Sequence, residues 1–196
     1  MTGLAARIVL GSASPRRALL LSQLGLSFTI RSAAINETPH PGEDPLSYVQ
    51  RMAREKSLAL ATSEQELLIT ADTTVISDGL SLGTPADREQ ARHMLKTLAG
   101  ARHEVVTAVS CRYERECRAR TVHTLVEFMD LSDALLEAYL DGEEPWDKAG
   151  SYALQGIAGS FIRRIEGSVS NVVGLPQVET REMLSELGVS TTVSSG

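Results

Sequence analysis

The stretch IVLGSASPRR, at positions 8–17, predicts how the chain begins to fold. Ile8–Gly11 is short and apolar, as expected for a buried strand. Ser14 and Pro15 then mark a helix start, because serine caps a helix and proline suits its first position. We expect this helix to run to about Leu24. A strand followed at once by a helix is typical of α/β proteins.

The rest of the chain repeats this alternation of apolar runs and helical stretches. It predicts an α/β fold with a mixed, twisted sheet flanked by helices. Residues 142–159 are rich in glycine and are expected to form a loop with a brief strand. The remaining expected strands are 67–76, 103–113, 121–129 and 161–165, and the first of these ends at an Asp78-Gly79 turn. The remaining expected helices are 45–61, 87–98, 132–140 and 176–187.

Composition narrows the class of protein. A chain of 196 residues, 42% apolar and 22% charged, fits one globular domain, expected over 1–189 with a frayed polar tail at 190–196. The net charge of −6 argues against non-specific nucleic-acid binding. Cys111 and Cys117 are too few for a disulfide framework. No apolar run approaches the roughly 20 residues of a membrane span, so no membrane partner and a cytoplasmic location are expected.

The turn between the first strand and helix is a candidate phosphate site. Helix N-termini carry unpaired N–H groups and partial positive charge, which suit an anion. Ser12 adds a hydroxyl, and Arg16 and Arg17 add cations where the helix dipole disfavours them unless an anion is bound. The alternative is a solvated basic turn without function.

Two further charged residues stand in apolar surroundings. Lys56 follows Val49, Met52 and Ala53 at helical spacing, so it lies on or near a buried stripe. It either contacts phosphate, extends to water or pairs with an acid. Asp72 ends a buried strand, where a metal and a water to activate would justify a carboxylate. The alternative for Asp72 is an acid that caps a turn.

The segment 143–156 mixes glycines, paired charges and an amide. Gln155 carries both donors and acceptors, which suits recognition of a base edge. The alternative is a solvated surface loop.

These motifs together resemble a known family. SASPRR, ADTTV, DKAGSYALQG and NVVGLP, in this order and spacing, are similar to motifs of the Maf nucleotide pyrophosphatases, from about Ile8 to Leu187. The resemblance implies a nucleotide-binding cleft between two lobes, as in ITPase-like folds, and a divalent cation, Mg²⁺ or Mn²⁺. It also implies hydrolysis of a nucleoside triphosphate to a monophosphate and pyrophosphate, and a possible homodimer. The loop form DKAGSYALQG resembles the branch that acts on dTTP and UTP.

The resemblance also implies roles for individual residues. Asp72 matches the catalytic carboxylate, and Glu37 matches a metal-binding or catalytic acid, although the paired acid of the family is Asn36 here. The metal would be held by Glu37 and Asp72. The positions expected to bind substrate are divided between phosphate contact and base selection. They are Arg17, Lys56 and Lys148 for phosphates, and Arg16, Thr73 and Gln155 for the choice of nucleotide. Ser12 is expected to bind substrate phosphate because of its place in the turn described above.

One position departs from the family pattern. The family usually has Gly-Lys-Pro where this chain has Gly83-Thr84-Pro85, so a phosphate-site cation is missing. Two alternative functions therefore stay open. One is a nucleotide-binding regulator of cell division with weak turnover, and the other is a pyrophosphatase for modified purine nucleotides such as 7-methyl-GTP.

Overall fold

The computed structural model describes residues 6–189, and the tail expected at 190–196 lies outside them. The described residues form two compact units. Unit 1 comprises residues 6–72, 107–122 and 174–189, and unit 2 comprises residues 73–106 and 123–173. None of the helices within 6–189 is both long and apolar enough to cross a membrane.

The strands form a mixed sheet. They pair in the order β2-β1-β3-β5-β6-β7, and β4 pairs with β3. The β1–β2 and β1–β3 pairs are parallel, whereas β3–β4 and β6–β7 are antiparallel. This confirms the predicted mixed α/β class. The strands are β1 (Arg7–Leu10), β2 (Phe28–Ile30), β3 (Glu66–Ser77), β4 (Leu80–Leu82), β5 (Arg102–Tyr113), β6 (Glu116–Phe128) and β7 (Ile162–Glu166).

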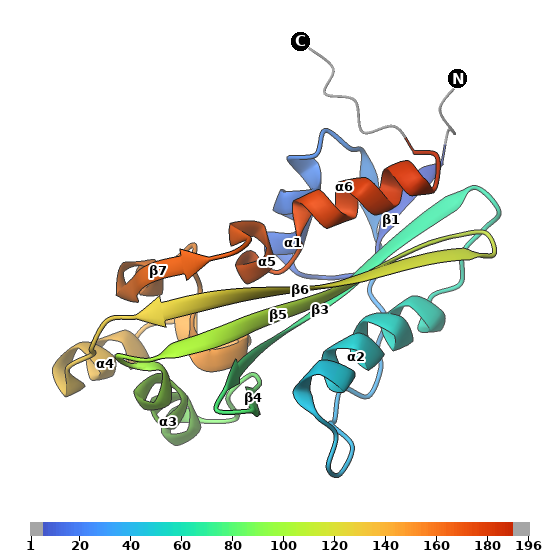
Figure 1. Cartoon of the computed structure of the whole chain (residues 1–196). Helices are drawn as coiled ribbons and strands as arrows, with labels where there is room; N and C mark the ends of the chain where they lie inside the picture. The colour runs from blue at the N-terminus through green and yellow to red at the C-terminus, as the bar shows by residue number, and fades with distance from the viewer. Residues whose placement is uncertain (1–5, 190–196) are drawn as a thin grey trace. The chain divides into compact units, whose positions relative to one another are not determined.

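Unit 1 is built around the parallel strands β1, β2 and the first part of β3. Three helices cover its sheet, with α1 and α6 on one face and α2 on the other (Figure 1). They are α1 (Pro15–Ser22), α2 (Pro45–Ala59) and α6 (Gln177–Glu186). Residues 67–72 of β3 are all buried, as expected for a central strand covered on both faces. Thr70 donates a hydrogen bond to the Ala53 carbonyl at 2.8 Å, which joins β3 to α2.

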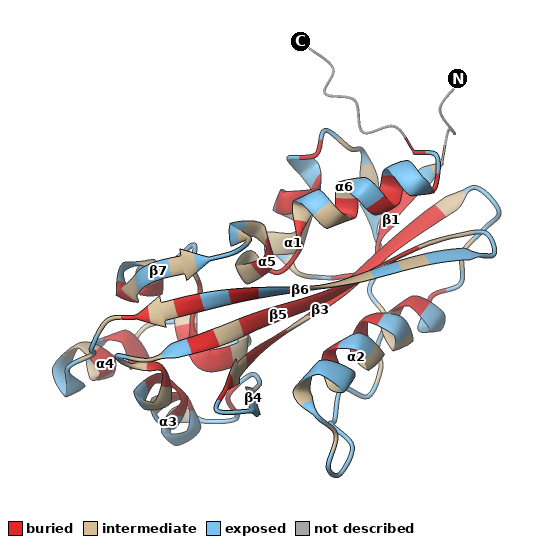
Figure 2. Cartoon of the chain, viewed as in Figure 1, coloured by how far each residue is buried: buried red, intermediate tan, exposed pale blue. Residues whose placement is uncertain are grey.

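Unit 2 contains the larger apolar cluster. Its helices and 3₁₀ segments are α3 (Arg88–Leu98), α4 (Asp133–Leu140), η1 (Glu144–Asp147), η2 (Ala149–Ser151), η3 (Ile157–Phe161) and α5 (Val169–Val173). Leu95, Phe128 and Phe161 are almost fully buried in this cluster. Figure 2 shows buried residues along the strands and along single stripes of the helices, while other stripes are exposed. The amphipathic pattern of the sequence is therefore realised in the fold.

Every helix predicted from a capping residue is present. Ser14, Asp44, Asp87 and Ser132 each accept a hydrogen bond from a backbone N–H in the first helical turn. The Asp78-Gly79 turn is also confirmed: both residues have positive φ, 48° and 76°, as a tight hairpin turn requires, and the turn joins β3 to β4.

Other predictions were wrong in detail. The brief strand expected within 142–159 is absent from that fully described segment, which forms η1, η2 and most of η3. β6 begins at Glu116 rather than Thr121, because its polar first residues continue the β5–β6 hairpin beyond the apolar pattern. The sequence reading also missed β2, β4 and α5, which have only three to five residues each.

His103 in β5 is a buried polar residue of the unit 2 core. Its Nε2 lies 2.8 Å from the Tyr152 hydroxyl, and its ring meets Phe128 edge-on with centroids 5.0 Å apart. Its Nδ1 has no hydrogen-bond partner among residues 6–189. Burial lowers the pKa of His103 to about 4. The folded protein therefore holds this imidazole neutral.

Acid is expected to destabilise the protein through His103. Below pH 6.5 His103 is protonated in the unfolded chain but not in the folded chain. The free energy of unfolding therefore falls as the pH falls from about 6.5 to about 4. The loss approaches roughly 3 kcal/mol, at 1.36 kcal/mol per pKa unit. Urea unfolding of the wild type and of His103→Gln at several pH values measures this loss. The variant should show a shallower decline, and equal slopes would contradict the assignment.

Candidate active site

The turn after β1 is shaped by close packing. Gly11 donates to the Ile69 carbonyl at 2.7 Å, and a Cβ at Gly11 would lie 2.6 Å from the Thr70 methyl group. Only glycine therefore lets the turn sit this close to β3. The buried Ser12 hydroxyl accepts hydrogen bonds from the Ser14 N–H and from Arg17 Nη1, both at 3.2 Å. The serine thus ties the turn to the first turn of α1.

Arg16 and Arg17 are half-buried in the first turn of α1. Arg17 Nε donates to the Gly174 carbonyl at 2.9 Å, which directs the guanidinium. Burial lowers the pKa of Arg17; the nearby charge of Asp72 raises it, and that of Arg16 lowers it. Because arginine stays protonated, a poorly hydrated guanidinium beside a second cation favours an anionic ligand.

Asp72 and Glu37 meet at one ammonium group. Lys56 Nζ lies 2.6 Å from Asp72 Oδ1 and 3.1 Å from Glu37 Oε1. The Lys56 and Asp72 side chains are only 11% and 9% exposed, whereas Glu37 is 54% exposed. Of the three alternatives for Lys56, which were phosphate contact, extension to water and pairing with an acid, the structure shows pairing with acids.

Asp72 is buried where unit 1 ends along β3. Burial raises the pKa of Asp72, while the charges of Lys56 and Arg17 lower it. A carboxylate that is desolvated yet kept beside cations is a stronger proton acceptor than an exposed aspartate, and it is a recognised mark of functional sites.

The two carboxylates fit a hard divalent cation. They offer only oxygen donors, and they already converge on one positive charge. Among residues 6–189, no group of three or more His, Cys, Asp or Glu side chains is placed to hold a metal ion. Mg²⁺ is commonly held by one or two carboxylates and completed by substrate phosphates and water, which matches this pair.

The structure brings six of the nine predicted site residues into unit 1, namely Ser12, Arg16, Arg17, Glu37, Lys56 and Asp72. Thr73, Lys148 and Gln155 belong to unit 2. Thr73 directly follows Asp72 in β3. Lys148 donates to the Glu144 carbonyl at 2.8 Å and pairs with Asp147, so its ammonium is engaged within its own loop.

Gln155 is exposed on a loop whose backbone is held by hydrogen bonds to Glu144. The Glu144 carboxylate accepts hydrogen bonds from the Ile157 and Ala158 N–H groups at 2.6 and 3.2 Å, and from the Tyr139 hydroxyl at 3.0 Å. The amide side chain is therefore presented to solvent from a fixed backbone, as a ligand-contacting residue requires.

Tyr48 and Arg51 were not predicted from the sequence. Both lie on α2 and hydrogen-bond to the backbone at Glu37 and Thr38. Tyr48 donates to the Glu37 carbonyl at 2.9 Å. Burial and the charges of Asp72 and Glu37 raise the pKa of Tyr48 to about 12. The spacing of positions 48, 51 and 55 places these side chains on one face of a helix, which the sequence displays. It does not show that the face contacts residues 37–43.

This fold and this site define a class of protein: an α/β protein in which a buried carboxylate lies beside cations that suit an anionic ligand. A comparison with protein families matches residues 7–187 to Maf, described as Maf-like protein. The chain belongs to the Maf family, which confirms the resemblance seen in its motifs.

Individual relatives extend this result. A protein of Shewanella sp. (strain MR-7), named dTTP/UTP pyrophosphatase, is 47% identical over 191 residues, covering 93% of this chain and 98% of that protein. A protein of the same name from Anaeromyxobacter sp. (strain Fw109-5) is 48% identical over 191 residues, covering 94% and 91%. The solved Staphylococcus aureus Ham1 protein matches with a TM-score of 0.49 and 14% identity, covering 92% of this chain and 99% of that one. This last similarity is too low to support any statement about function.

Proposed function

We propose that this chain is a nucleoside triphosphate pyrophosphatase that hydrolyses dTTP and UTP to the monophosphate and pyrophosphate. The observation that carries this proposal is the buried Asp72 carboxylate, held by Lys56 at 2.6 Å and within the electrostatic reach of Arg17. The names of the relatives that are 47 and 48% identical over nearly their whole length support the same substrates.

In this proposal Asp72 accepts the proton of the attacking water. Its raised pKa favours proton transfer, and Lys56 keeps it ionised until the water is in place. Water adds to the α-phosphorus, the bond from that phosphorus to the α–β bridging oxygen breaks, and pyrophosphate leaves with that oxygen. Asp72 holds the proton that the water gave up.

The cations of unit 1 offset the charge of the triphosphate. Ser12 and the N-terminus of α1 donate to phosphate oxygens, and Arg16 and Arg17 neutralise charge that grows on the leaving pyrophosphate. Lys56 is already placed beside Asp72, so it stabilises the same region. These groups are fixed before substrate arrives, which reduces the reorganisation needed during the reaction.

A divalent ion, Mg²⁺ or Mn²⁺, completes this site in the proposal. Glu37 and Asp72 would hold it, as their oxygen donors and their shared cation allow. When bound, it supplies Lewis-acid polarisation of the phosphate and acidifies a water molecule.

In this proposal Gln155 is the main residue that chooses the base. Gln155 is exposed on an anchored loop and offers both a donor and an acceptor to a pyrimidine edge. Arg16 and Thr73 assist this choice, as their positions in the family motifs imply. Lys148 adds charge for the triphosphate by exchanging its pairing with Asp147, whose side chain is 69% exposed. A homodimer and a cytoplasmic location stay predictions.

A nucleotide panel tests the proposal. With Mg²⁺ or Mn²⁺ present, dTTP and UTP are expected to show higher kcat/KM than ATP, GTP or 7-methyl-GTP, measured by pyrophosphate release. A purine triphosphate with the highest kcat/KM would contradict the substrate assignment. Tight binding of nucleotides without turnover would instead favour a regulatory nucleotide-binding protein.

A further inference from the structure

The segment 36–43 carries Glu37 but has no helix or strand of its own. Its residues are mostly exposed, and they precede the Asp44 cap of α2. Ordering such a segment costs backbone conformational entropy at every residue. Because Glu37 reaches Lys56 only if this segment is held, some group outside the segment must hold it.

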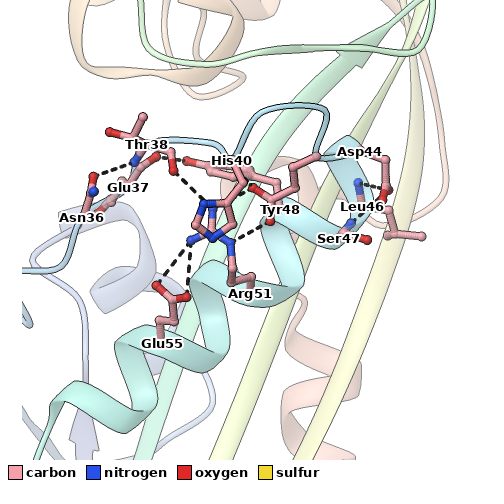
Figure 3. A network of polar contacts seen from close by, with 11 residues as sticks. Asn36, Glu37, Thr38, His40, Asp44, Leu46, Ser47, Tyr48, Arg51 and Glu55 are labelled. Carbon is pink, nitrogen blue, oxygen red and sulfur yellow. Dashed lines mark hydrogen bonds and ion pairs between the residues drawn. The ribbon is translucent and has the colours of Figure 1, made fainter.

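Arg51 on α2 supplies this hold. Its Nε and Nη2 donate to the two Glu43 carboxylate oxygens at 2.6 and 2.7 Å, and Nη2 also donates to the Thr38 carbonyl at 3.2 Å. Nη1 donates to Glu55 at 3.3 Å, one turn further along α2. Figure 3 shows Arg51 between Thr38 and Glu55. One guanidinium therefore joins both ends of the segment to the helix.

The link between Arg51 and Glu43 is sheltered from solvent. Their side chains are 18% and 9% exposed, and the two parallel hydrogen bonds form a bidentate pair. The hydrogen bonds from Arg51 lower the pKa of Glu43 to about 2, and those from Glu43 raise the pKa of Arg51. Both groups therefore stay charged across the working range of pH.

Tyr48 fixes the backbone next to the carboxylate itself. Its hydroxyl donates to the Glu37 carbonyl at 2.9 Å, and the Arg51 guanidinium lies 5.6 Å from its ring centroid. Tyr48 and Arg51 are three residues apart on α2, and Lys56 follows on the same helix. The helix thus presents the residues that hold the segment together with the cation that Glu37 contacts.

We propose that Arg51 is a positioning residue, which holds the segment 36–43 so that the Glu37 carboxylate stays on Lys56 beside Asp72. The role of Glu37 as a metal-holding acid rests on the proposed function, whereas the ordering of the segment does not. Within residues 6–189, Arg51 makes no hydrogen bond or ion pair with Glu37, Lys56 or Asp72, so its effect passes through the segment.

Three readouts test this role. Arg51→Gln is expected to lower kcat about tenfold, in the range found when a partner that orients a metal ligand is lost. In the metal-free protein it is also expected to speed amide hydrogen exchange in 36–43, and it should weaken Mn²⁺ binding, followed by EPR without nucleotide. Arg54→Gln is the matched control, because Arg54 is an exposed arginine on the same helix. It should change none of these, and Arg51→Lys should restore only part of each.

A double-mutant cycle separates positioning from general stability. If Arg51 acts through Glu37, Arg51→Gln should lower kcat less than about twofold once Glu37→Gln is present, because the effects of coupled residues do not add. Full additivity, or unchanged exchange in 36–43, would overturn the proposal. If Glu37→Gln alone keeps full activity, the proposed metal role of Glu37 fails, and hydrogen exchange in 36–43, which does not depend on a metal, decides the positioning role separately. If Arg51→Gln does not fold, Glu43→Ala removes the same link from the other side and is judged by the same outcomes.

Discussion

Replacing Asp72 by asparagine is expected to lower kcat at least about a hundredfold, as for loss of a general base or metal ligand. Asparagine has the same shape but is a far weaker proton acceptor and carries no charge for a metal. It also leaves Lys56 with Glu37 as its remaining carboxylate partner. Steady-state hydrolysis of dTTP at saturating Mg²⁺ or Mn²⁺ measures the effect.

The fold should survive this change. Asp72 is buried, but asparagine has the same shape, and the pairing of β3 with β1 involves Glu66–Ile69 rather than Asp72. Circular dichroism and the thermal midpoint of the variant serve as controls. Retention of more than a tenth of the wild-type kcat, at saturating metal, would show that another residue accepts the proton.

Replacing Thr84 by lysine is expected to raise kcat/KM on dTTP or UTP about tenfold to a hundredfold. A charge-assisted contact with a phosphate is worth roughly 1.5–3 kcal/mol, and 1.36 kcal/mol corresponds to a factor of ten. Thr84 is exposed, and Gly83 before it accepts a hydrogen bond from the Gly150 N–H at 3.1 Å. A lysine at position 84 would therefore extend from a backbone that is hydrogen-bonded to the loop carrying Lys148.

An uncharged side chain of similar length provides the control. Thr84→Gln adds reach without charge, so it should leave kcat/KM close to that of the wild type. The preference between bases should not change in either variant, because phosphates are common to all triphosphates. If lysine gives no gain, or a loss, then another basic residue already fills this subsite and the missing family lysine carries no deficit.

Local signals predicted most of the fold. Caps and prolines marked the starts of α1 and α2, and the Asp78-Gly79 turn marked the end of β3. These signals act within a few residues of one another, so a sequence displays them directly. β2 and β4 were missed because strands of three residues have too few positions to show a period, and their stability comes from pairing with β1 and β3.

The site was partly predictable for the same reason. Helical spacing indicated that Lys56 is buried, and an acid after an apolar run singled out Asp72. No local pattern links positions 37, 56 and 72, so the shared contact appears only in the structure. The proposed role of Arg51 depends on its contacts with the segment 36–43, whose sequence has no periodic pattern. Its charge was visible in the sequence, but its partner was not.

The most direct test of the central claim is the identity of the products. Purified protein is incubated with dTTP or UTP and Mg²⁺ or Mn²⁺, and the products are separated by ion-exchange chromatography and assigned by phosphorus NMR. Cleavage between the α- and β-phosphates predicts equal amounts of the nucleoside monophosphate and pyrophosphate, with no diphosphate intermediate. Nucleoside diphosphate with inorganic phosphate, or no turnover of either nucleotide, would contradict the account.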